Sequence, residues 1–429
     1  MDNHAAQAMI RFGLGRRGQE PLPDDPTAWL RAQLRGADPG PPGSDVAQGF
    51  YAIRLDQENK PQPGTPGAVR TLFKAEQDGL VANAITTATP FRERLVWFWA
   101  NHFTVSLRNG RTGALGGDFI RTAIRPYATG KFSDMLLAVI RHPAMLLYLD
   151  NAASIGPNSV VGKTAKRGLN ENLARECLEL HTVSPASGYT QEDVTSFARV
   201  LTGWSVANGD RAPPGFLFRS GIHEPGAKTV LGHEVPQGEA GGTDMLAFLA
   251  AHPATYRHLA TKLVQHFVAD TPPPAAVHTI EAVLRDTKGD LGQAAAALVG
   301  LPAAWEPLVK LRTPQDYVLA VLRAVDLPET KRPDGAGLMR ALGQPLFGAP
   351  FPIGWPDQAV EWAGPEAMMR RVDWAYGFSG RAAALDPAML AEASLGSFLT
   401  ADTNGAIRGA GSRRDGLTLL FTSPEFQRR

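Results

Sequence analysis

The chain contains the stretch Asn170-Glu171-Asn172-Leu173-Ala174-Arg175-Glu176-Cys177-Leu178-Glu179-Leu180-His181-Thr182-Val183. On a helix of about 100° per residue, its polar side chains fall within one arc of about 140°: Glu171, Asn172, Arg175, Glu176 and Glu179. The remaining arc carries apolar side chains: Leu173, Ala174, Cys177, Leu178 and Leu180. This pattern predicts an amphipathic helix. Its polar face is either a solvated exterior or one wall of a polar site.

The same helical period recurs on both sides of this stretch. Helices are predicted in the segments 68–103 (broken near Pro90), 119–125, 132–140, 190–201, 255–268, 291–298 and 314–324. Two apolar runs, Phe216 to Arg219 and Lys228 to Leu231, flank Pro225-Gly226 and predict a small β-hairpin near 215–235. Because strands do not alternate with helices, a doubly wound sheet is excluded.

The predicted fold is therefore mainly α, with 1–429 forming one large helical domain that carries this hairpin insertion. Residues 1–67 supply an N-terminal helix and a loop rich in Pro and Gly. Residues 68–330 supply the helical core with the motifs. Residues 331–429 supply a loop rich in Pro, Gly and aromatic residues (343–357), followed by further helices.

Composition narrows the class of protein. The net charge of the 429 residues is +1, so no overall field attracts nucleic acid. The single cysteine, Cys177, excludes a disulfide framework. No window approaches the roughly 18 apolar residues of a transmembrane segment, and the N-terminus has no export signal. We therefore expect a cytoplasmic protein; export together with a signal-bearing partner, or a form that has lost its signal, would make it periplasmic.

Candidate site residues lie in three places. Asn101 and His102 end an apolar helix, where an imidazole needs a specific partner. The polar arc adds Glu171, Arg175, Glu176 and Glu179, and the predicted hairpin adds His223 and Lys228. We expect catalytic roles for Glu176, Glu171, His102 and Arg175, and substrate binding by Asn101, Glu179, His223 and Lys228. Glu176 is the carboxylate of the arc expected to point most towards the interior.

These residue types fit several functions. Carboxylates beside a histidine either hold a divalent metal, with His102, Glu176 and His223 as ligands, or form an acid–base pair. The leading hypothesis is a hydrolase or lyase acting on a small polar, anionic or carbohydrate substrate. One alternative is a binding or assembly module for a co-encoded secreted partner, and another is a metal-dependent redox enzyme. The set His258, Lys262 and His266 is interpreted as a solvated helix face.

Several motifs recur in a characteristic order. They are Arg11 to Gly15, Trp99 to Phe103, His142 to Met145 with Leu149-Asp150-Asn151, Asn170 to Thr182, Gly188-Tyr189-Thr190 with Asp193-Val194, Leu201 to Trp204, His223 with Gly226 and Lys228, His252-Pro253-Ala254, and Gly343-Gln344-Pro345 with Gly354-Trp355-Pro356. As an ordered set they resemble the bacterial family called domain of unknown function 1800. The resemblance implies no settled activity. It does imply frequent export and a gene neighbour related to sulfatases and alkaline phosphatases.

Overall fold

The computed structural model describes residues 3–36, 38, 40–107, 110–165, 168–209 and 212–429. Its α-helices are α1 (Asn3–Gln7), α2 (Pro26–Ala32), α3 (Val46–Glu58), α4 (Ala68–Thr86), α5 (Pro90–His102), α6 (Gly116–Phe119), α7 (Phe132–Arg141), α8 (Pro143–Tyr148), α9 (Asn172–Glu176), α10 (Gln191–Leu201), α11 (Glu239–Ala251), α12 (Pro253–Phe267), α13 (Pro274–Asp286), α14 (Leu291–Gly300), α15 (Pro314–Val325), α16 (Gly335–Ala341), α17 (Pro365–Ser379), α18 (Pro387–Leu395), α19 (Ala401–Arg408), α20 (Arg413–Thr422) and α21 (Pro424–Gln427). The prediction of a mainly α fold is confirmed. Within the described ranges, no helix combines the length and the apolarity that crossing a membrane requires.

Three of the four strands lie within the predicted hairpin region near 215–235, whereas β1 lies before it, and the pairing differs from the prediction. β1 (Trp204–Ala207) pairs antiparallel with β2 (Gly215–Phe218), and β3 (Lys228–Val230) pairs with β4 (His233–Val235). The two predicted apolar runs therefore belong to different ribbons. The turn that reverses β3 contains Leu231 and Gly232, both with positive φ, rather than Pro225-Gly226.

The helix expected from the opening stretch is shorter and less regular than predicted. α9 continues as a π-helical turn, η6 (Cys177–His181). Leu173, Ala174, Cys177 and Leu178 are buried, as their arc predicted. π-Turns recur at functional sites because they re-aim side chains and carbonyl groups. Here the last two residues of the turn, Leu180 and His181, meet side chains from other helices.

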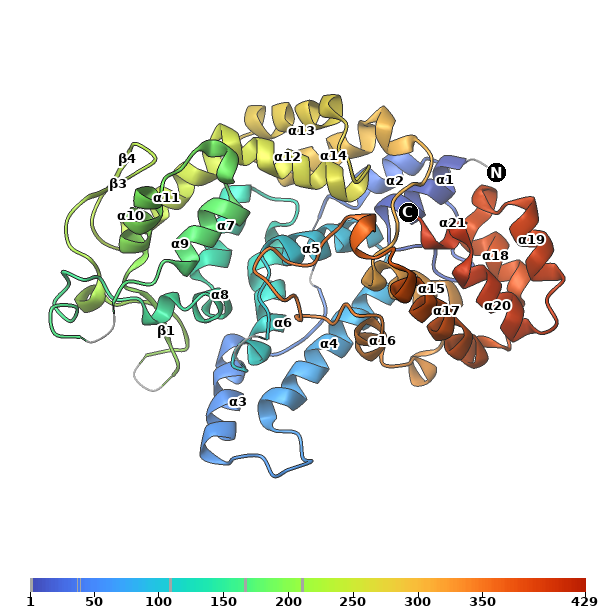
Figure 1. The fold of residues 1–429 in the computed structure, drawn as a ribbon, viewed down its shortest axis with the longest axis horizontal. Helices are drawn as coiled ribbons and strands as arrows, with labels where there is room; N and C mark the ends of the chain where they lie inside the picture. The colour runs from blue at the N-terminus through green and yellow to red at the C-terminus, as the bar shows by residue number, and fades with distance from the viewer. Residues whose placement is uncertain (1–2, 37, 39, 108–109, 166–167, 210–211) are drawn as a thin grey trace.

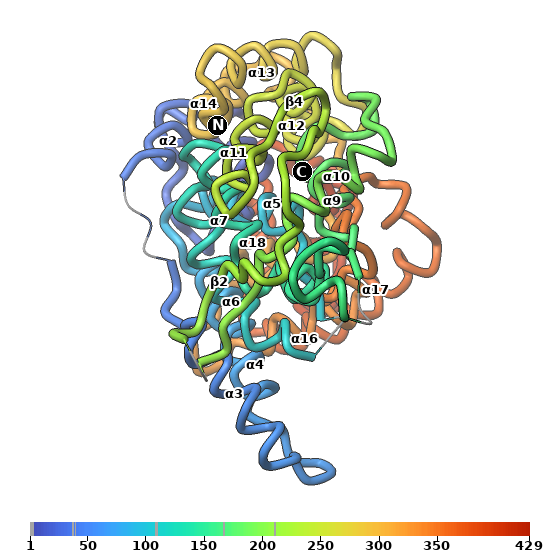
Figure 2. Tube along the Cα trace, turned by 90° about the vertical axis from the view of Figure 1, so that its left-hand side faces the viewer, coloured from blue at the N-terminus to red at the C-terminus, as the bar shows by residue number. Residues whose placement is uncertain are grey.

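Two apolar cores hold the helices together. The first contains side chains of α5, α7, α8, α10 and α12. The second surrounds α15 and α20, and α4 contributes to both. Figures 1 and 2 show α3 and α4 projecting together away from the rest of the molecule.

Helix α5 lies where the cores approach each other, and a long loop passes beside it. This loop, residues 343–361, is called the strap below (the orange trace near α5 in Figure 1). Asn101 fixes it by a pair of hydrogen bonds: its Nδ2 donates to the carbonyl of Trp355 at 2.9 Å, and its Oδ1 accepts from the Trp355 amide at 2.8 Å. At Gly354, φ is +84°, and a Cβ would lie 2.4 Å from the Asn101 carbonyl oxygen. Only glycine fits this close approach.

Candidate functional site

The polar arc of the opening helix lies at the surface of the protein, facing α10. Glu171 accepts hydrogen bonds from Thr195 Oγ1 at 2.7 Å and from Gln191 Nε2 at 2.9 Å, and it pairs with Arg175 at 2.9 Å. These bonds, Thr195 first, lower the pKa of Glu171 although partial burial opposes them. The arrangement fastens α9 to α10. It leaves Glu171 and Arg175 with partners of their own.

Glu176 differs from Glu171 in its surroundings. It is half-buried, and burial together with the neighbouring carboxylate of Glu179 raises its pKa, while Arg175 opposes this. Glu179 itself accepts a hydrogen bond from the hydroxyl of Tyr189 at 3.3 Å. The charged groups that act most on Glu176 therefore belong to its own arc.

His223 and Lys228 form a second group, next to the end of α10. His223 Nδ1 donates to the carbonyl of Thr202 at 2.7 Å, and its Nε2 accepts from the Gly238 amide at 2.9 Å. Lys228 Nζ donates to the backbone carbonyl of Glu224. The Glu224 carboxylate in turn accepts from the backbone amide and the side chain of Asn158. We call these residues the latch, because each polar atom bonds a neighbouring stretch of chain.

The three residues predicted as metal ligands are not brought into one group. Within the described parts of the chain, no three His, Cys, Asp or Glu side chains are arranged to hold a metal ion. His223 also has both ring nitrogens occupied by backbone partners. The placement of His102, Glu176 and His223 therefore does not support the predicted ligand set.

Asn101 and His102 line a pocket of about 410 Å³ between α5, α12 and the strap, which we call the strap pocket. Its walls are built by three segments of chain: Phe98, Asn101 and His102 from α5; Lys262, Gln265 and His266 from α12; and Pro350, Phe351, Ile353, Gly354, Trp355, Pro356, Asp357, Gln358 and Glu361 from the strap. Pockets that mix aromatic walls with a few polar groups are the usual setting for small-molecule binding. Of the eight residues predicted for the site, this lining includes Asn101 and His102.

His102 is held neutral by its position. Its Nε2 lies 3.2 Å from the backbone carbonyl of His181, which is an acceptor, so Nε2 carries the proton. Nδ1 then has a lone pair, and it has no hydrogen-bond partner among the described residues. Burial lowers the pKa of His102 well below its usual value, and the nearby charge of Lys262 lowers it further.

A second imidazole, that of His258, forms a hydrogen bond at the end of η6. His258 Nε2 donates to the carbonyl of Leu180 at 3.0 Å, so two histidines from other helices satisfy carbonyls that a helix end would otherwise leave unpaired. Burial lowers the pKa of His258 to about 4, although this hydrogen bond opposes the shift. Burial also lowers the pKa of His181 to about 3. The ring centroids of His181 and His258 lie 6.1 and 6.0 Å from that of His102.

Lys262 lies one turn beyond His258 on α12 and lines the strap pocket. Among the described residues, it makes no hydrogen bond and has no carboxylate within ion-pair distance. Burial lowers the pKa of Lys262, and the carboxylate of Asp357 opposes this only partly. The contrast with Lys310 is sharp, since that buried ammonium is paired with Asp270. A buried cation is normally paired, so Lys262 is an exception that needs an explanation.

A network of buried ion pairs forms the floor beside the pocket. Asp316 pairs with Arg94 at 2.9 Å and with Arg429 at 2.8 Å. Arg429 also pairs with Asp357 at 3.0 Å, and Asp357 accepts from His266 Nδ1 at 3.1 Å. Burial lowers the pKa of His266 to about 4, against the opposing effect of Asp357. These mutual bonds fix the end of the strap and leave Asp357 little capacity to neutralise Lys262.

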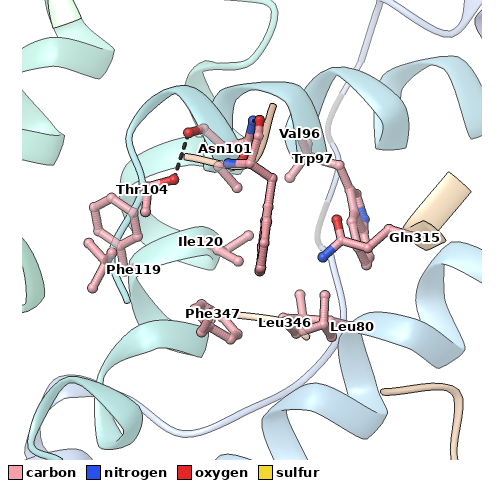
Figure 3. A pocket seen from close by; sticks show the side chains of 13 residues that line it. Leu80, Val96, Trp97, Asn101, Thr104, Phe119, Ile120, Gln315, Leu346 and Phe347 are labelled. Atoms are coloured by element: carbon pink, nitrogen blue, oxygen red, sulfur yellow. Dashed lines mark hydrogen bonds between the residues drawn. The ribbon is translucent and has the colours of Figure 1, made fainter. Parts of the chain in front are cut away.

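A second hollow of about 70 Å³ lies on the other side of Asn101 and Trp355 (Figure 3), and we call it the apolar chamber. Its wall includes the apolar side chains of Leu80, Val96, Phe119, Ile120, Leu346 and Phe347. An apolar void of this size corresponds to roughly 2 kcal/mol of lost packing. A smaller polar hollow lined by Arg94 and Asp316 shares Asn101 and Trp355 with both.

The α12 side of this site differs from its prediction. His258, Lys262 and His266 were predicted to form a solvated face, and that prediction is wrong: all three are largely buried, and Lys262 and His266 line the pocket. The available signal was their spacing of four residues, which puts them on one face of a helix. The sequence does not say what that face meets, because the strap that covers it lies about ninety residues further along the chain.

Comparison with known proteins gives one match. A family model described as protein of unknown function (DUF1800) matches residues 7–428. The chain belongs to this family, as the order of its motifs predicted. No curated protein and no solved structure matches the chain significantly. Because the family description names no activity, the function has to be inferred from the site itself.

Proposed function

We propose that this protein is an enzyme of the hydrolase or lyase type that performs acid–base chemistry on a small polar or anionic substrate in the strap pocket. The observation that supports this most is the amino group of Lys262, which is largely buried on the pocket wall and has no partner among the described residues. Leaving a cation unpaired in a buried site is costly. Groups perturbed by burial in a cleft are concentrated at functional sites.

Lys262 has two useful protonation states in such a site. Protonated, it supplies the charge that an anionic group of the substrate pairs with. Neutral, it takes a proton from the substrate, and burial makes this form available at a lower pH than in an exposed lysine. Both roles require that no protein carboxylate already holds the ammonium group.

The residues around Lys262 support these roles. His102, predicted from sequence as catalytic, is a neutral ring that lines the same pocket from α5, so it neither adds positive charge nor competes for an anion. Asn101 holds Trp355 and thereby sets the width of the pocket. In this proposal Glu171, Arg175, Glu176 and Glu179 fasten the surface helix, and His223 and Lys228 act in the latch.

The proposal is tested with a panel of p-nitrophenyl esters, phosphates and glycosides and with unsaturated-product assays on polyuronates. The variant is Lys262→Met, which keeps the length of the side chain and removes its charge. The matched control is Lys74→Met on α4, where the lysine side chain is 60% exposed and pairs with Asp78. We expect Lys262→Met to lose about 100-fold or more of whatever turnover the wild type shows, and Lys74→Met to keep it.

One result contradicts the proposal: a wild-type protein whose turnover does not exceed that of Lys262→Met on any class of the panel. A melting curve of Lys262→Met separates loss of function from loss of fold, and we expect its Tm to stay the same or rise because an unpaired buried charge is gone.

A further inference from the structure

Most polar groups that line the apolar chamber are bonded within the chain, and the exception is the indole N–H of Trp355, which has no partner among the described residues. Thr104 Oγ1 donates to the Asn101 carbonyl at 2.7 Å, shown dashed in Figure 3. The Asn101 amide is occupied on both sides by the backbone of Trp355. Gln315 Nε2 donates to the Gln344 carbonyl at 3.4 Å. Water in the chamber would find few partners, whereas an apolar group would fill it without breaking a hydrogen bond.

Three apolar side chains of the chamber are firmly held. Val96 and Phe119 are each 1% exposed and Leu80 is 3% exposed, so these three belong to the packed cores. They come from different elements, and Figure 3 shows the labelled side chains converging on the hollow from opposite sides. Leu346, Phe347 and Trp355 complete the wall from the strap, so the chamber is a preformed hollow between packed helices and this loop.

The chamber and the strap pocket meet at the same two residues. Asn101 and Trp355 line both hollows, and they also line the small polar hollow between them. Lys262 lines the strap pocket on one side of these two residues, and Ile120 lines the chamber on the other. One molecule that reaches past Trp355 would therefore meet a cation at one end and an apolar wall at the other.

We infer that the apolar chamber binds a small apolar group of the ligand, so that the ligand is an amphiphilic anion with a short aliphatic chain or a ring. The anionic end pairs with Lys262, and the apolar end lies among Val96, Phe119 and Ile120. This inference rests on the proposed function for the anionic end only. The chamber itself is a separate site whose occupancy can be measured without the lysine.

The test is a binding series on the purified full chain by ligand-observed NMR. The probes are acetate, butanoate and hexanoate, which share a carboxylate and differ in chain length, and toluene, which has no charge. In the wild type we expect the affinity to rise about fourfold for each methylene group that enters the chamber. We also expect toluene to bind.

Two variants separate the two ends of the ligand. Ala100→Leu places a larger side chain in the chamber wall and should abolish toluene binding and the dependence on chain length, while acetate still binds. Ile120→Phe fills the same space from the opposite segment and replaces Ala100→Leu if that variant does not fold. Lys262→Met should lose acetate binding and keep toluene binding.

The results that overturn the inference differ from those that overturn the proposed function. Equal affinity for acetate and hexanoate in the wild type, or unchanged chain-length dependence in both filled variants, refutes the chamber as a binding site. Equal acetate affinity in the wild type and Lys262→Met refutes the role of the lysine. In that second case, toluene binding that is lost in Ala100→Leu still supports the chamber.

Discussion

Two histidine–lysine pairs in this protein have opposite surroundings. In the latch, both ring nitrogens of His223 and the ammonium of Lys228 are bonded to backbone atoms. In the strap pocket, His102 keeps one ring nitrogen without a partner and Lys262 makes no ion pair among the described residues. Histidine and lysine therefore stabilise the fold in the latch, whereas in the strap pocket they have polar atoms without hydrogen-bond or ion-pair partners. Polar atoms without partners beside a cavity, rather than the residue types, identify the candidate active site.

The largest expected difference is between substitutions of the two lysines, Lys262 in the strap pocket and Lys228 in the latch. Lys262→Met should reduce turnover by about 100-fold or more and leave the free energy of unfolding unchanged or slightly higher. Lys228→Met should lower the free energy of unfolding by about 1–3 kcal/mol, because the Glu224 carbonyl loses its donor. Urea denaturation and a turnover assay on both variants measure this. The opposite pattern, with Lys228→Met inactive but fully stable, would place the active site at the latch instead of the strap pocket.

The histidines near Lys262 predict a dependence of stability on pH. His258 has a folded pKa of about 4, below the ordinary value of about 6.5 that it regains on unfolding. Between these values the unfolded chain binds a proton that the folded chain does not, so stability is full above about pH 6.5 and is lost as the pH falls towards 4. Each such histidine contributes about 1.4 kcal/mol per pH unit in that window.

The variant His258→Gln isolates this contribution. The slope of the unfolding free energy between pH 6 and pH 4.5 should decrease by about 1.4 kcal/mol per pH unit relative to the wild type. Chemical denaturation at several pH values gives the slope. An identical slope in the variant and the wild type would show that burial does not shift the pKa of His258 in the folded protein.

Within the latch, His223 is predicted to act through its bonds to the backbone. Removal of the ring in His223→Ala leaves the Thr202 carbonyl and the Gly238 amide without their partners, which should cost about 2–3 kcal/mol of unfolding free energy. Per folded molecule, turnover should not change. A His223→Ala variant that is stable but has lost turnover would instead show that this histidine belongs to the active site.

The smallest expected contrast separates two carboxylates of the surface arc. Glu171→Gln should lower the unfolding free energy by about 0.5–1 kcal/mol, because Glu171 is partly exposed and its pairing with Arg175 is screened by solvent. Glu176 has a raised pKa, so its ionised form at neutral pH opposes folding and Glu176→Gln should be neutral or slightly stabilising. Thermal unfolding of both variants tests the order, and greater destabilisation by Glu176→Gln would contradict it.

The helical period predicted the fold because burial of apolar stripes is a local property of the sequence. The boundary at Pro90 and the Thr190 cap of α10 follow from local rules, and both occur in the structure. The pairing of the strands does not follow from such rules, since Phe216 finds its partner at Val206 across the 207–215 connection rather than near Pro225.

The site was harder to predict than the fold for a related reason. Asn101 and His102 could be recognised as polar residues at the end of an apolar helix. Lys262 could not, because a lysine between two histidines on one helix face is equally compatible with solvent and with a pocket. The decision depends on the strap, whose Gly354 and Trp355 meet Asn101 from a distant part of the chain.

The central claim, that Lys262 presents a buried and unpaired amine to the strap pocket, is tested most directly by acetylation. Acetic anhydride reacts with neutral amines, and mass spectrometry follows each lysine separately across a pH series. The account predicts that Lys262 in the native protein reacts at a lower pH than the same lysine in urea-unfolded protein, because burial lowers its pKa. A native Lys262 that reacts only at the pH of the unfolded chain, or not at all, would contradict the account.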